Sequence, residues 1–479
     1  MVDPLATLLA LCRELDRRQA AVKQAEDWYD GNHPVPLPPP NTPAAVPNSE
    51  AAKAFVALSK LSITNLTPPI VDVPADALRM EGFHFGESPV ATDRDAWEIF
   101  QRNYLDADAP LANKAAVKTG QSFVLVWVDS DGKAVVTVED PSQVIVQYEA
   151  GSRRKRAAAL KRWIDEDGYT LATLYLPDFV YKFRSSGQAS SPAGLVLPAS
   201  SGDWAPREVP GEVWPLPNPL AEVPVVELRA NPPLRASLYG GGTSQLAKVL
   251  NEQRKLNRTV MGLLIAEDNQ SFRQRWATDW AYPTNPDGTP DKAAMAAFSA
   301  SRLFVAQSGE GENPVRLGEF AQADFRPFLE TILAWIKVMA SNSGTPPYAF
   351  LLGDMINVAA DSLARIEGIQ LGIREALADQ LGEGWEEAMR LALKVEGNPK
   401  ADDTATSVVW AEFERRTATE QIALAQAMKT LGAPDEAVFA ALPGVTQQEA
   451  ARWVIEKKAE ELLHPLPVAP ESAPANAHP

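Results

Sequence analysis

The order of helix-forming and helix-breaking segments between residues 240 and 393 constrains the fold of this chain more than any other feature. Apolar residues recur at helical spacing over residues 243–268 and again over 324–342, and a turn-rich insert separates the two segments. A Gly-Thr-Pro-Pro run at 344–347 then breaks the chain before a much longer helical pattern that opens at Asp361. The sequence therefore predicts a hairpin of two helices with a β-like insert, followed by a loop and a long helix.

Both predicted hairpin helices have an apolar face and a charged face. At about 100° per residue, the apolar residues of each helix fall on one arc and the charged residues on another. Gln253 and Asn257 lie inside the apolar arc of the first helix, so this face should meet a neighbouring helix partly through hydrogen bonds. Ordinary surface helices, whose charged faces meet water, have the same pattern. The basic residues on the charged faces are Lys248, Arg254, Lys255, Arg258 and Lys337.

Length and composition limit the class of protein. A chain of 479 residues is too long for a single core and should form two or more domains. Its composition, 45% hydrophobic and 22% charged, is that of a globular protein, and no apolar run approaches the roughly 18 residues that span a bilayer. The N-terminus predicts an amphipathic helix and not a signal peptide, because charged residues follow its apolar run directly. Cys12, the only cysteine, excludes an intramolecular disulfide and suits a reducing compartment.

The remainder of the chain is modular. Residues 1–30 predict a helix, the proline-rich stretch over 34–47 an extended arm with little capacity to fold alone, and residues 50–66 a second helix. The stretch 185–219, rich in Ser, Gly and Pro, predicts a mobile surface loop. Runs of β-branched and aromatic residues between tight turns predict an antiparallel meander. The expected strands are residues 123–128, 135–138, 144–148, 160–164, 169–176 and 179–183.

No motif indicates catalysis, a cofactor or a metal. The glycine run at 240–242 precedes a helix but lacks the lysine of a phosphate-binding loop, so it predicts a flexible hinge into an N-cap. The aspartate-rich runs at 129–132 and 165–168 lack the ligand series and closing glutamate of a calcium loop and predict turns. The four histidines share no ligand spacing. Paired carboxylates cannot be judged before the fold is known.

The densest basic run, residues 153–156, predicts an exposed turn between two strands rather than a nucleic-acid patch, because no aromatic row accompanies it. In the long helix, Gly368 and Gly372 lie four residues apart and predict close packing against another element. This helix, with Asp361 as its N-cap, should carry one continuous apolar stripe. The stripe consists of Leu363, Ile366, Ile369, Ile373, Leu377, Leu381, Trp385, Ala388 and Leu391.

The C-terminal part predicts a strand at 408–410, then three helices over 417–431, 435–442 and 446–463, and a disordered tail over 464–479. Together with the meander at 159–183, the first hairpin helix at 244–264 and the loop and helix start at 344–363, these elements follow a characteristic order. In this order the chain resembles the portal proteins of tailed bacteriophages, in particular those of long-tailed phages with Gram-positive or actinobacterial hosts.

The resemblance implies an α+β portal fold with a mixed α/β wing, a two-helix stem, a small β-containing clip, a long spine helix and a helical crown. The implied segments are 1–50 for an N-terminal helix and proline-rich arm, 51–240 for the wing, 241–270 for the first stem helix, 271–323 for the clip, 324–343 for the second stem helix, 344–360 for the tunnel loop, 361–415 for the spine helix and return strand, 416–463 for the crown and 464–479 for the tail.

The resemblance also implies a ring of twelve copies at one capsid vertex, through which double-stranded DNA enters during packaging and leaves at infection. The expected partners are further copies of the chain, DNA, the terminase large subunit, a head-tail adaptor, and the major capsid and scaffolding proteins, with no membrane. Assembly would take place in the host cytoplasm and the final location would be the virion. The net charge of −17 argues against a protein that grips DNA over its whole surface and suits a channel that touches DNA lightly.

Three sets of candidate contact residues follow from the resemblance. The basic residues of the two stem helices would touch DNA in the channel. The clip residues that would meet the terminase or the adaptor are Arg273, Gln274, Arg275 and Trp276. The tunnel-loop residues that would project into the channel are Gly344, Pro346, Pro347, Leu352, Gly353, Asp354, Met355, Ile356 and Asn357.

Two alternatives remain open at this point. Another head-to-tail connector component would share the virion but would usually be far shorter. A hydrolase with an unrecognised carboxylate site belongs to a different class. Electron microscopy discriminates between these interpretations, since rings with a central hole favour the portal and compact monomers favour the hydrolase.

Overall fold

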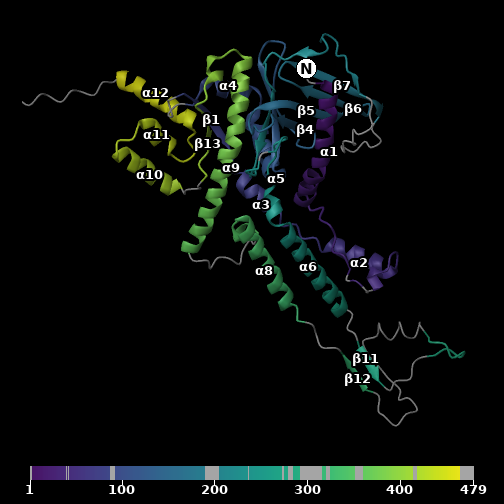
Figure 1. The fold of residues 1–479 in the computed structure, drawn as a ribbon. Coiled ribbons are helices and arrows are strands. Elements are labelled where there is room, and N and C mark those ends of the chain that lie inside the picture. The colour runs from purple at the N-terminus through teal and green to yellow at the C-terminus, as the bar shows by residue number, and fades with distance from the viewer. Residues whose placement is uncertain are drawn as a thin grey trace, which may run out of the picture. The chain divides into compact units, whose positions relative to one another are not determined.

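The computed structural model describes residues 3–38, 40, 43–86, 92–188, 204–235, 237–271, 275–278, 284–291, 316–319, 324–350, 360–413 and 418–463. Helices and antiparallel strands both contribute, in agreement with the predicted α+β class. The chain divides into two compact units, each of which is described by itself (Figure 1). Unit 1 comprises Met1–Asn32, Asn65–Leu250 and Ala340–Pro479, and unit 2 comprises His33–Thr64 and Asn251–Met339. No helix within the described ranges is long and apolar enough to cross a membrane.

Unit 1 contains most of the helices and strands. Its helices are α1 (Pro4–Tyr29), α3 (Pro68–Ala75), α4 (Arg94–Arg102), α5 (Leu105–Thr119), α9 (Ala360–Val395), α10 (Ala418–Thr430), α11 (Asp435–Ala440) and α12 (Gln447–Leu463), with the 3-10 turns η2 (Gln245–Lys248), η3 (Pro347–Ala349) and η4 (Pro399–Asp402). Its strands are β1 (Met80–Phe85), β2 (Gln121–Val128), β3 (Ala134–Glu139), β4 (Val144–Tyr148), β5 (Arg156–Ile164), β6 (Tyr169–Tyr175), β7 (Phe179–Gln188), β8 (Trp204–Pro206), β9 (Leu216–Pro217), β10 (Val225–Arg229) and β13 (Thr406–Trp410).

The first helix and the largest sheet of unit 1 pack together. Asp3 caps α1 by accepting a hydrogen bond from the Leu5 amide at 3.0 Å, and Pro4 occupies the first turn, where its missing N–H costs nothing. Strands β4 to β8 form an antiparallel sheet in chain order, with β9 paired to β7. Because side chains alternate along a strand, Ile145 and its neighbours on one face meet α1. That buried cluster consists of Leu8, Leu11, Cys12, Leu15, Ile145, Ala158, Leu160, Ala172, Leu174 and Phe183.

The predicted meander is confirmed, with one correction. The turns at 129–132 and 165–168 each join two antiparallel strands, β2 to β3 and β5 to β6. The stretch 185–219 is not a single loop, because β8 and β9 add to β7 through the registers Phe183↔Pro206 and Val180↔Leu216. The sequence missed both strands because they are only three and two residues long and contain proline, which is rare inside strands.

A second sheet, in the order β10-β2-β3, and a third, β1-β13, complete the strands of unit 1. Figure 1 shows the long helix α9, in light green, running alongside these strands. The strand predicted at 408–410 is confirmed as part of β13, which pairs with β1 from Met80↔Trp410 to Phe85↔Thr406. Thus one antiparallel pair joins two segments of unit 1 that lie far apart in the sequence.

The long helix α9 begins at Ala360, one residue before the predicted N-cap. Its C-terminal half packs as predicted, since Leu377, Leu381 and Trp385 are buried. The predicted stripe is not continuous, because 58% of Ile369 is exposed. A Cβ atom built on Gly368 or Gly372 would meet no atom within 4 Å among the described residues, so the described part of the chain supplies no partner for the predicted close packing.

The three C-terminal helices form where the sequence predicts them, as α10, α11 and α12. The Phe439 and Trp453 rings of α11 and α12 lie 5.8 Å apart edge to face, and Lys457 Nζ reaches Asp435 Oδ2 at 2.6 Å. The tail predicted over 464–479 lies outside the described residues.

Unit 2 contains the predicted helical hairpin and the proline-rich arm. Its elements are η1 (Pro43–Ala45), α2 (Glu50–Leu61), α6 (Leu250–Ser271), β11 (Arg275–Thr278), β12 (Arg316–Glu319) and α8 (Arg326–Ser343). The second hairpin helix is confirmed to within two residues at its start. The β-like insert is confirmed in part, since β11 and β12 pair antiparallel.

Candidate functional site

The first hairpin helix begins later than its apolar pattern predicts. Ser244 caps the short turn η2 by accepting a hydrogen bond from the Leu246 amide at 3.1 Å, and α6 begins only at Leu250. The turn is held in place because Gln245 Nε2 donates to the Ser343 carbonyl at 3.3 Å within unit 1. Lys248 therefore does not belong to α6, and its prediction as part of the first hairpin helix is wrong. Partial burial of its own side chain lowers the pKa of Lys248.

The two amides in the apolar arc of α6 bind the N-terminal arm and not a neighbouring helix. Gln253 and Asn257 are 0% and 1% exposed. The Gln253 amide donates to the Thr64 carbonyl at 2.6 Å and to Asn257 Oδ1 at 2.8 Å. Asn257 Oδ1 accepts from the Thr64 amide at 3.2 Å, and Asn257 Nδ2 lies 3.1 Å from Nδ1 of the buried His33. Both ends of the arm, at His33 and Thr64, are thus fixed to one side of α6.

The opposite side of α6 meets α8. Lys255 Nζ lies 4.8 Å from the centre of the Trp335 ring, a cation–π distance. A Cβ atom built on Gly262 would lie 3.1 Å from a ring carbon of Phe328, so the absence of a side chain allows this helix contact. At about 100° per residue, Lys255 and Gly262 lie half a turn round α6 from Gln253 and Asn257.

The remaining basic candidates of the two helices are exposed. Arg254 and Arg258 lie on the flank of α6 between its two contact faces, and Arg258 Nη1 donates to the Leu37 carbonyl at 3.3 Å. Lys337 is exposed on α8. The structure therefore brings Arg254 and Arg258 to one flank of α6, to which Lys248 does not belong.

Helix α8 keeps much apolar surface exposed. Leu329, Leu333 and Val338 are 52%, 41% and 39% exposed. Large apolar side chains along most of one helix are usually covered in a soluble assembly. At about 100° per residue, Leu329 and Leu333 lie on one side of α8 and Val338 on the opposite side, so the exposed residues extend beyond the single predicted apolar arc.

The glycine run before η2 is a tightly packed crossing, and its prediction as a flexible hinge is wrong. A Cβ atom on Gly242 would lie 2.1 Å from the carbonyl oxygens of Gly120 and Ala230. The Gly241 amide donates to Glu227 Oε1 at 2.7 Å. Three backbone segments meet here, which explains why no side chain fits.

The start of the predicted tunnel loop is described. Gly344 has a φ of +70°, and a Cβ atom there would lie 2.5 Å from Cδ1 of Ile373 on α9. Pro346 is buried and Pro347 begins η3. The other tunnel-loop candidates, Leu352, Gly353, Asp354, Met355, Ile356 and Asn357, lie outside the described residues.

Of the clip candidates, only two lie in the described residues. Arg275 and Trp276 belong to β11, where they pair with Glu319 and Gly318 of β12. Arg273 and Gln274 lie outside the described ranges.

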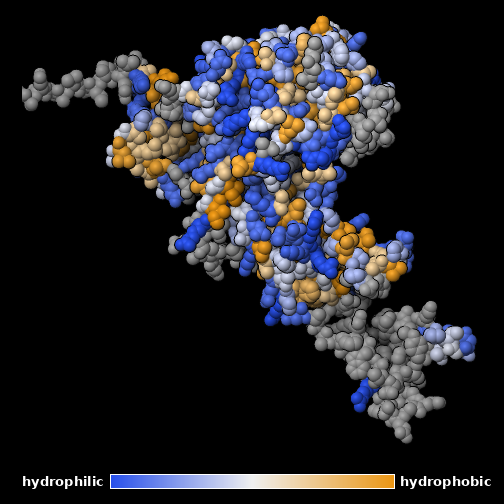
Figure 2. Space-filling view, viewed as in Figure 1, coloured by the Kyte–Doolittle hydropathy of each residue, from blue (hydrophilic) through white to orange (hydrophobic). Residues whose placement is uncertain are grey.

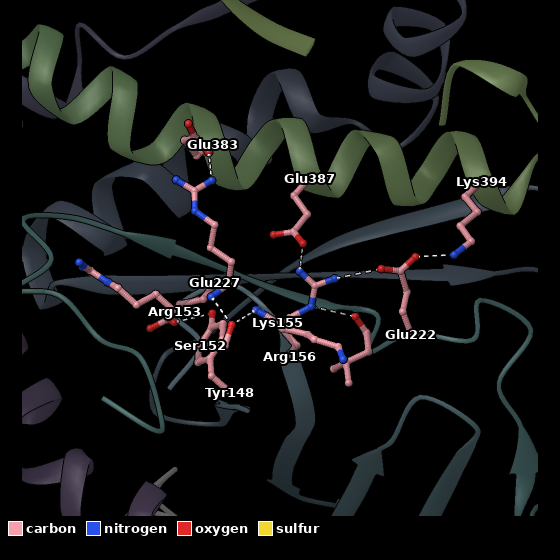
Figure 3. Close-up of polar contacts among 12 residues, drawn as sticks. Tyr148, Ser152, Arg153, Lys155, Arg156, Glu222, Glu227, Glu383, Glu387 and Lys394 are labelled. Atoms are coloured by element: carbon pink, nitrogen blue, oxygen red, sulfur yellow. Dashed lines mark hydrogen bonds and ion pairs between the residues drawn. The ribbon is translucent and has the colours of Figure 1, made fainter. Parts of the chain in front are cut away.

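The basic run at 153–156 makes contacts within unit 1 (Figure 3). Arg154 Nη1 reaches Glu383 of α9 at 2.6 Å, and Arg153 Nη2 donates to the Pro233 carbonyl at 2.9 Å. Arg156 is buried as the first residue of β5 and pairs with Glu387 of α9. The predicted exposed turn is thus correct for residues 153–155, while Arg156 ties the sheet to α9.

A cavity of about 540 Å³ lies beside these ion pairs. At its wall the buried Glu227 carboxylate accepts from the Tyr148 hydroxyl at 2.9 Å and from Arg229 Nε at 2.8 Å. Burial, and then the charge of Glu227, raise the pKa of Tyr148, so its hydroxyl stays protonated and donates. No sequence pattern indicates this cluster, because Tyr148 comes from one segment and Glu227 and Arg229 from another that is distant in the sequence. Among the described residues no group of three or more His, Cys, Asp or Glu could hold a metal ion.

Helix α8 keeps apolar surface exposed, a strand-containing insert separates it from α6, and the long helix α9 packs on a mixed α/β unit. Exposed apolar surface of this kind is typical of a structural subunit that assembles with other proteins. The chain belongs to the phage portal protein family described as SPP1 Gp6-like, which matches residues 11–461. The portal protein of Mycobacterium phage L5 is 25% identical over 366 residues, covering 71% of this chain and 67% of the relative. The portal protein of Mycobacterium phage D29 is similar over the same shares at 25% identity.

These matches confirm the resemblance to portal proteins, including its actinobacterial hosts. The chain is a portal protein, a virion component of a bacteriophage, and its family is structural rather than enzymatic. The comparisons therefore support the portal interpretation over the connector and the hydrolase. Proteins of this family assemble as a homo-oligomeric ring associated with the capsid.

Proposed function

We propose that twelve copies of this chain form a closed ring in which α6 and α8 are the stem, β11 and β12 belong to the clip, residues 344–360 are the tunnel loop, α9 is the spine and α10–α12 are the crown. Unit 1 supplies the wing. The observation that carries this proposal is the exposed apolar surface of α8, because a single hairpin leaves Leu329 and Leu333 in water. Neighbouring copies would cover this surface and extend the apolar pairing of the two helices around the ring.

The purified protein should form closed rings with twelve times the mass of one chain. Light scattering at micromolar concentration and physiological salt measures this mass, and electron microscopy shows the central hole. Leu329→Glu combined with Leu333→Glu should give monomers, because each charge would have to be buried against a neighbour. The matched control is Val213→Glu, a substitution of an apolar residue that is 65% exposed in unit 1. A wild-type protein that remains monomeric under these conditions would contradict the ring.

Within this ring, Arg254 and Arg258 are the best candidates for contact with DNA. Both lie on the flank of α6 between its two contact faces, and both are exposed, although Arg258 also donates to the Leu37 carbonyl of the arm. Ring symmetry would convert each of them into a circle of positive charge in an otherwise acidic protein. Phosphate contacts release counterions and weaken steeply with salt, so a few such circles slow DNA without holding it. Lys255 contributes less, since its ammonium group is engaged with Trp335.

Arg254→Gln combined with Arg258→Gln should leave the rings intact and make filled heads lose their DNA sooner, with a weaker salt dependence than native heads. DNA content after incubation at increasing ionic strength is the measurement. The control is Arg13→Gln combined with Lys23→Gln, which removes two charges from α1. Rings that dissociate at lower salt would instead indicate pairing between subunits, and unchanged retention with intact rings would reject both roles.

The proposed partners follow from the same assignment. The terminase large subunit, which would supply ATP hydrolysis, and the head-tail adaptor would dock at the clip. The major capsid and scaffolding proteins would surround the wing during assembly in the host cytoplasm. The tunnel loop beyond Phe350 would reach into the channel, and the clip candidates beside β11 would form part of the docking surface.

A further inference from the structure

Unit 2 has a groove along one face of α8. Its volume is about 360 Å³. The residues that line it recur at intervals of three and four, which is the spacing of one continuous stripe on a helix. They are Pro327, Glu330, Thr331, Ala334, Trp335 and Val338. This stripe is apolar with a single carboxylate. A second helix can pack its own side chains into a groove of this kind.

Helix α2, in the arm of the same unit, carries a stripe of matching spacing. Val56 is 47% exposed and Leu61 is 73% exposed, although both are large apolar residues. Figure 2 shows hydrophobic residues gathered at the surface over this segment. The stripe consists of Lys53, Val56, Ala57, Lys60 and Leu61, all of them exposed. The lysines give it the charge that complements Glu330 in the groove of α8.

The two stripes lie on opposite sides of α6. The arm is fixed to one side of α6 through Gln253 and Asn257, and α8 packs on the other side through Lys255 and Gly262. Figure 1 shows the resulting order, in which α6 lies between α8 and α2. A stripe on α2 therefore cannot cover the groove on α8 of its own chain while the arm remains bound to α6.

A closed ring joins each subunit to the next through two different surfaces, one on each side, because a head-to-tail contact pairs unlike patches. Unit 2 offers such a pair. We propose that α2 of one subunit lies in the α8 groove of its neighbour, so that the arm is a strap between adjacent subunits, with Val56 and Leu61 against Ala334 and Val338 and with Lys60 near Glu330. This inference rests on the proposed ring and adds the identity of one of its contacts.

A cysteine pair tests the strap directly. Val56→Cys combined with Ala334→Cys should, on mild oxidation of assembled rings, give a ladder of covalent multimers on a denaturing gel. The native Cys12 does not interfere, because it is 1% exposed and burial raises its pKa to about 11. The matched control is Ala51→Cys with Ala334→Cys, since Ala51 is exposed on the opposite side of α2. A ladder in the control alone, or in neither protein, would overturn the strap.

A second variant keeps the test independent of cysteine geometry. Val56→Asp combined with Leu61→Asp should raise the concentration for half-assembly on the order of 100-fold, because both side chains would lose an apolar partner. The control Ala51→Asp should leave assembly unchanged. If the wild type forms rings and the aspartate variant forms them equally well, the strap is wrong and the ring proposal stands. Intact variant rings that fail to enter heads would assign α2 to a capsid component instead, which also overturns the strap. A monomeric wild type would refute the ring itself.

Discussion

Gly242→Ala should destabilise unit 1 by more than about 4 kcal/mol, which places it among the most damaging single substitutions expected in this chain. The added methyl group would lie 2.1 Å from two main-chain oxygens, those of Gly120 and Ala230. Neither oxygen can move by side-chain rotation, and both are fixed, because the Ala230 amide donates to the Gly120 carbonyl at 2.9 Å and the Thr243 amide to the Ala230 carbonyl at 2.9 Å. The substitution would therefore separate the backbone segments that carry β2, β10 and η2.

Denaturant unfolding monitored by near-ultraviolet circular dichroism measures this effect. The control is Gly368→Ala on α9, where a methyl group would meet no atom of the described residues within 4 Å. Because alanine favours a helix interior over glycine by about 1 kcal/mol, this control should be neutral or slightly more stable in the unassembled chain. Equal unfolding midpoints for the wild type and Gly242→Ala would show that the crossing relaxes and that the close approach is unimportant.

Trp385→Ala should have the second largest effect, a loss of about 3–5 kcal/mol from the cavity alone. Trp385 is 0% exposed, its ring centre lies 6.5 Å from that of Phe100, and its Nε1 donates to Asn113 Oδ1 at 2.8 Å. Asn113 in turn donates to the Leu78 carbonyl at 3.1 Å. The indole thus holds α9, α4, α5 and the segment before β1 together.

Trp385→Phe separates the two components of this effect. Phenylalanine keeps most of the aromatic volume and leaves the buried Asn113 oxygen without its donor, which should cost about 1–3 kcal/mol. Thermal unfolding should therefore rank the proteins as wild type, then Trp385→Phe, then Trp385→Ala. A Trp385→Phe variant as unstable as Trp385→Ala would show that packing volume matters less than the hydrogen bond.

Local sequence patterns predicted the helices and strands that local interactions determine. The apolar period of α1, α8 and α9 and the tight turns of the meander placed these elements within a few residues. The order of elements then indicated the portal family, which the comparisons confirm. The strands β8 and β9 were missed because they are short and exist only through pairing with β7.

The candidate site was predicted less completely, because its details depend on partners distant in the sequence. Gln253 and Asn257 were recognised as polar residues in an apolar arc, but nothing in their neighbourhood shows that Thr64 and His33 satisfy them. Lys248 was assigned to the first stem helix because its apolar neighbours keep helical spacing through residue 249. A 3-10 turn has nearly the same spacing over four residues, so contacts with residues distant in the sequence, such as that of Gln245 with Ser343, decide between the two.

The pairing of β1 with β13 bears on how this protein is made. Met80 meets Trp410, so a ribosome has to synthesise the intervening residues before the first strand finds its partner. Until then β1 has no strand partner, and an unpaired strand edge is a template for unwanted pairing with another chain. Every product truncated before residue 406 retains that edge permanently. The first strand of a subunit is therefore paired only after residues 406–410 have been synthesised.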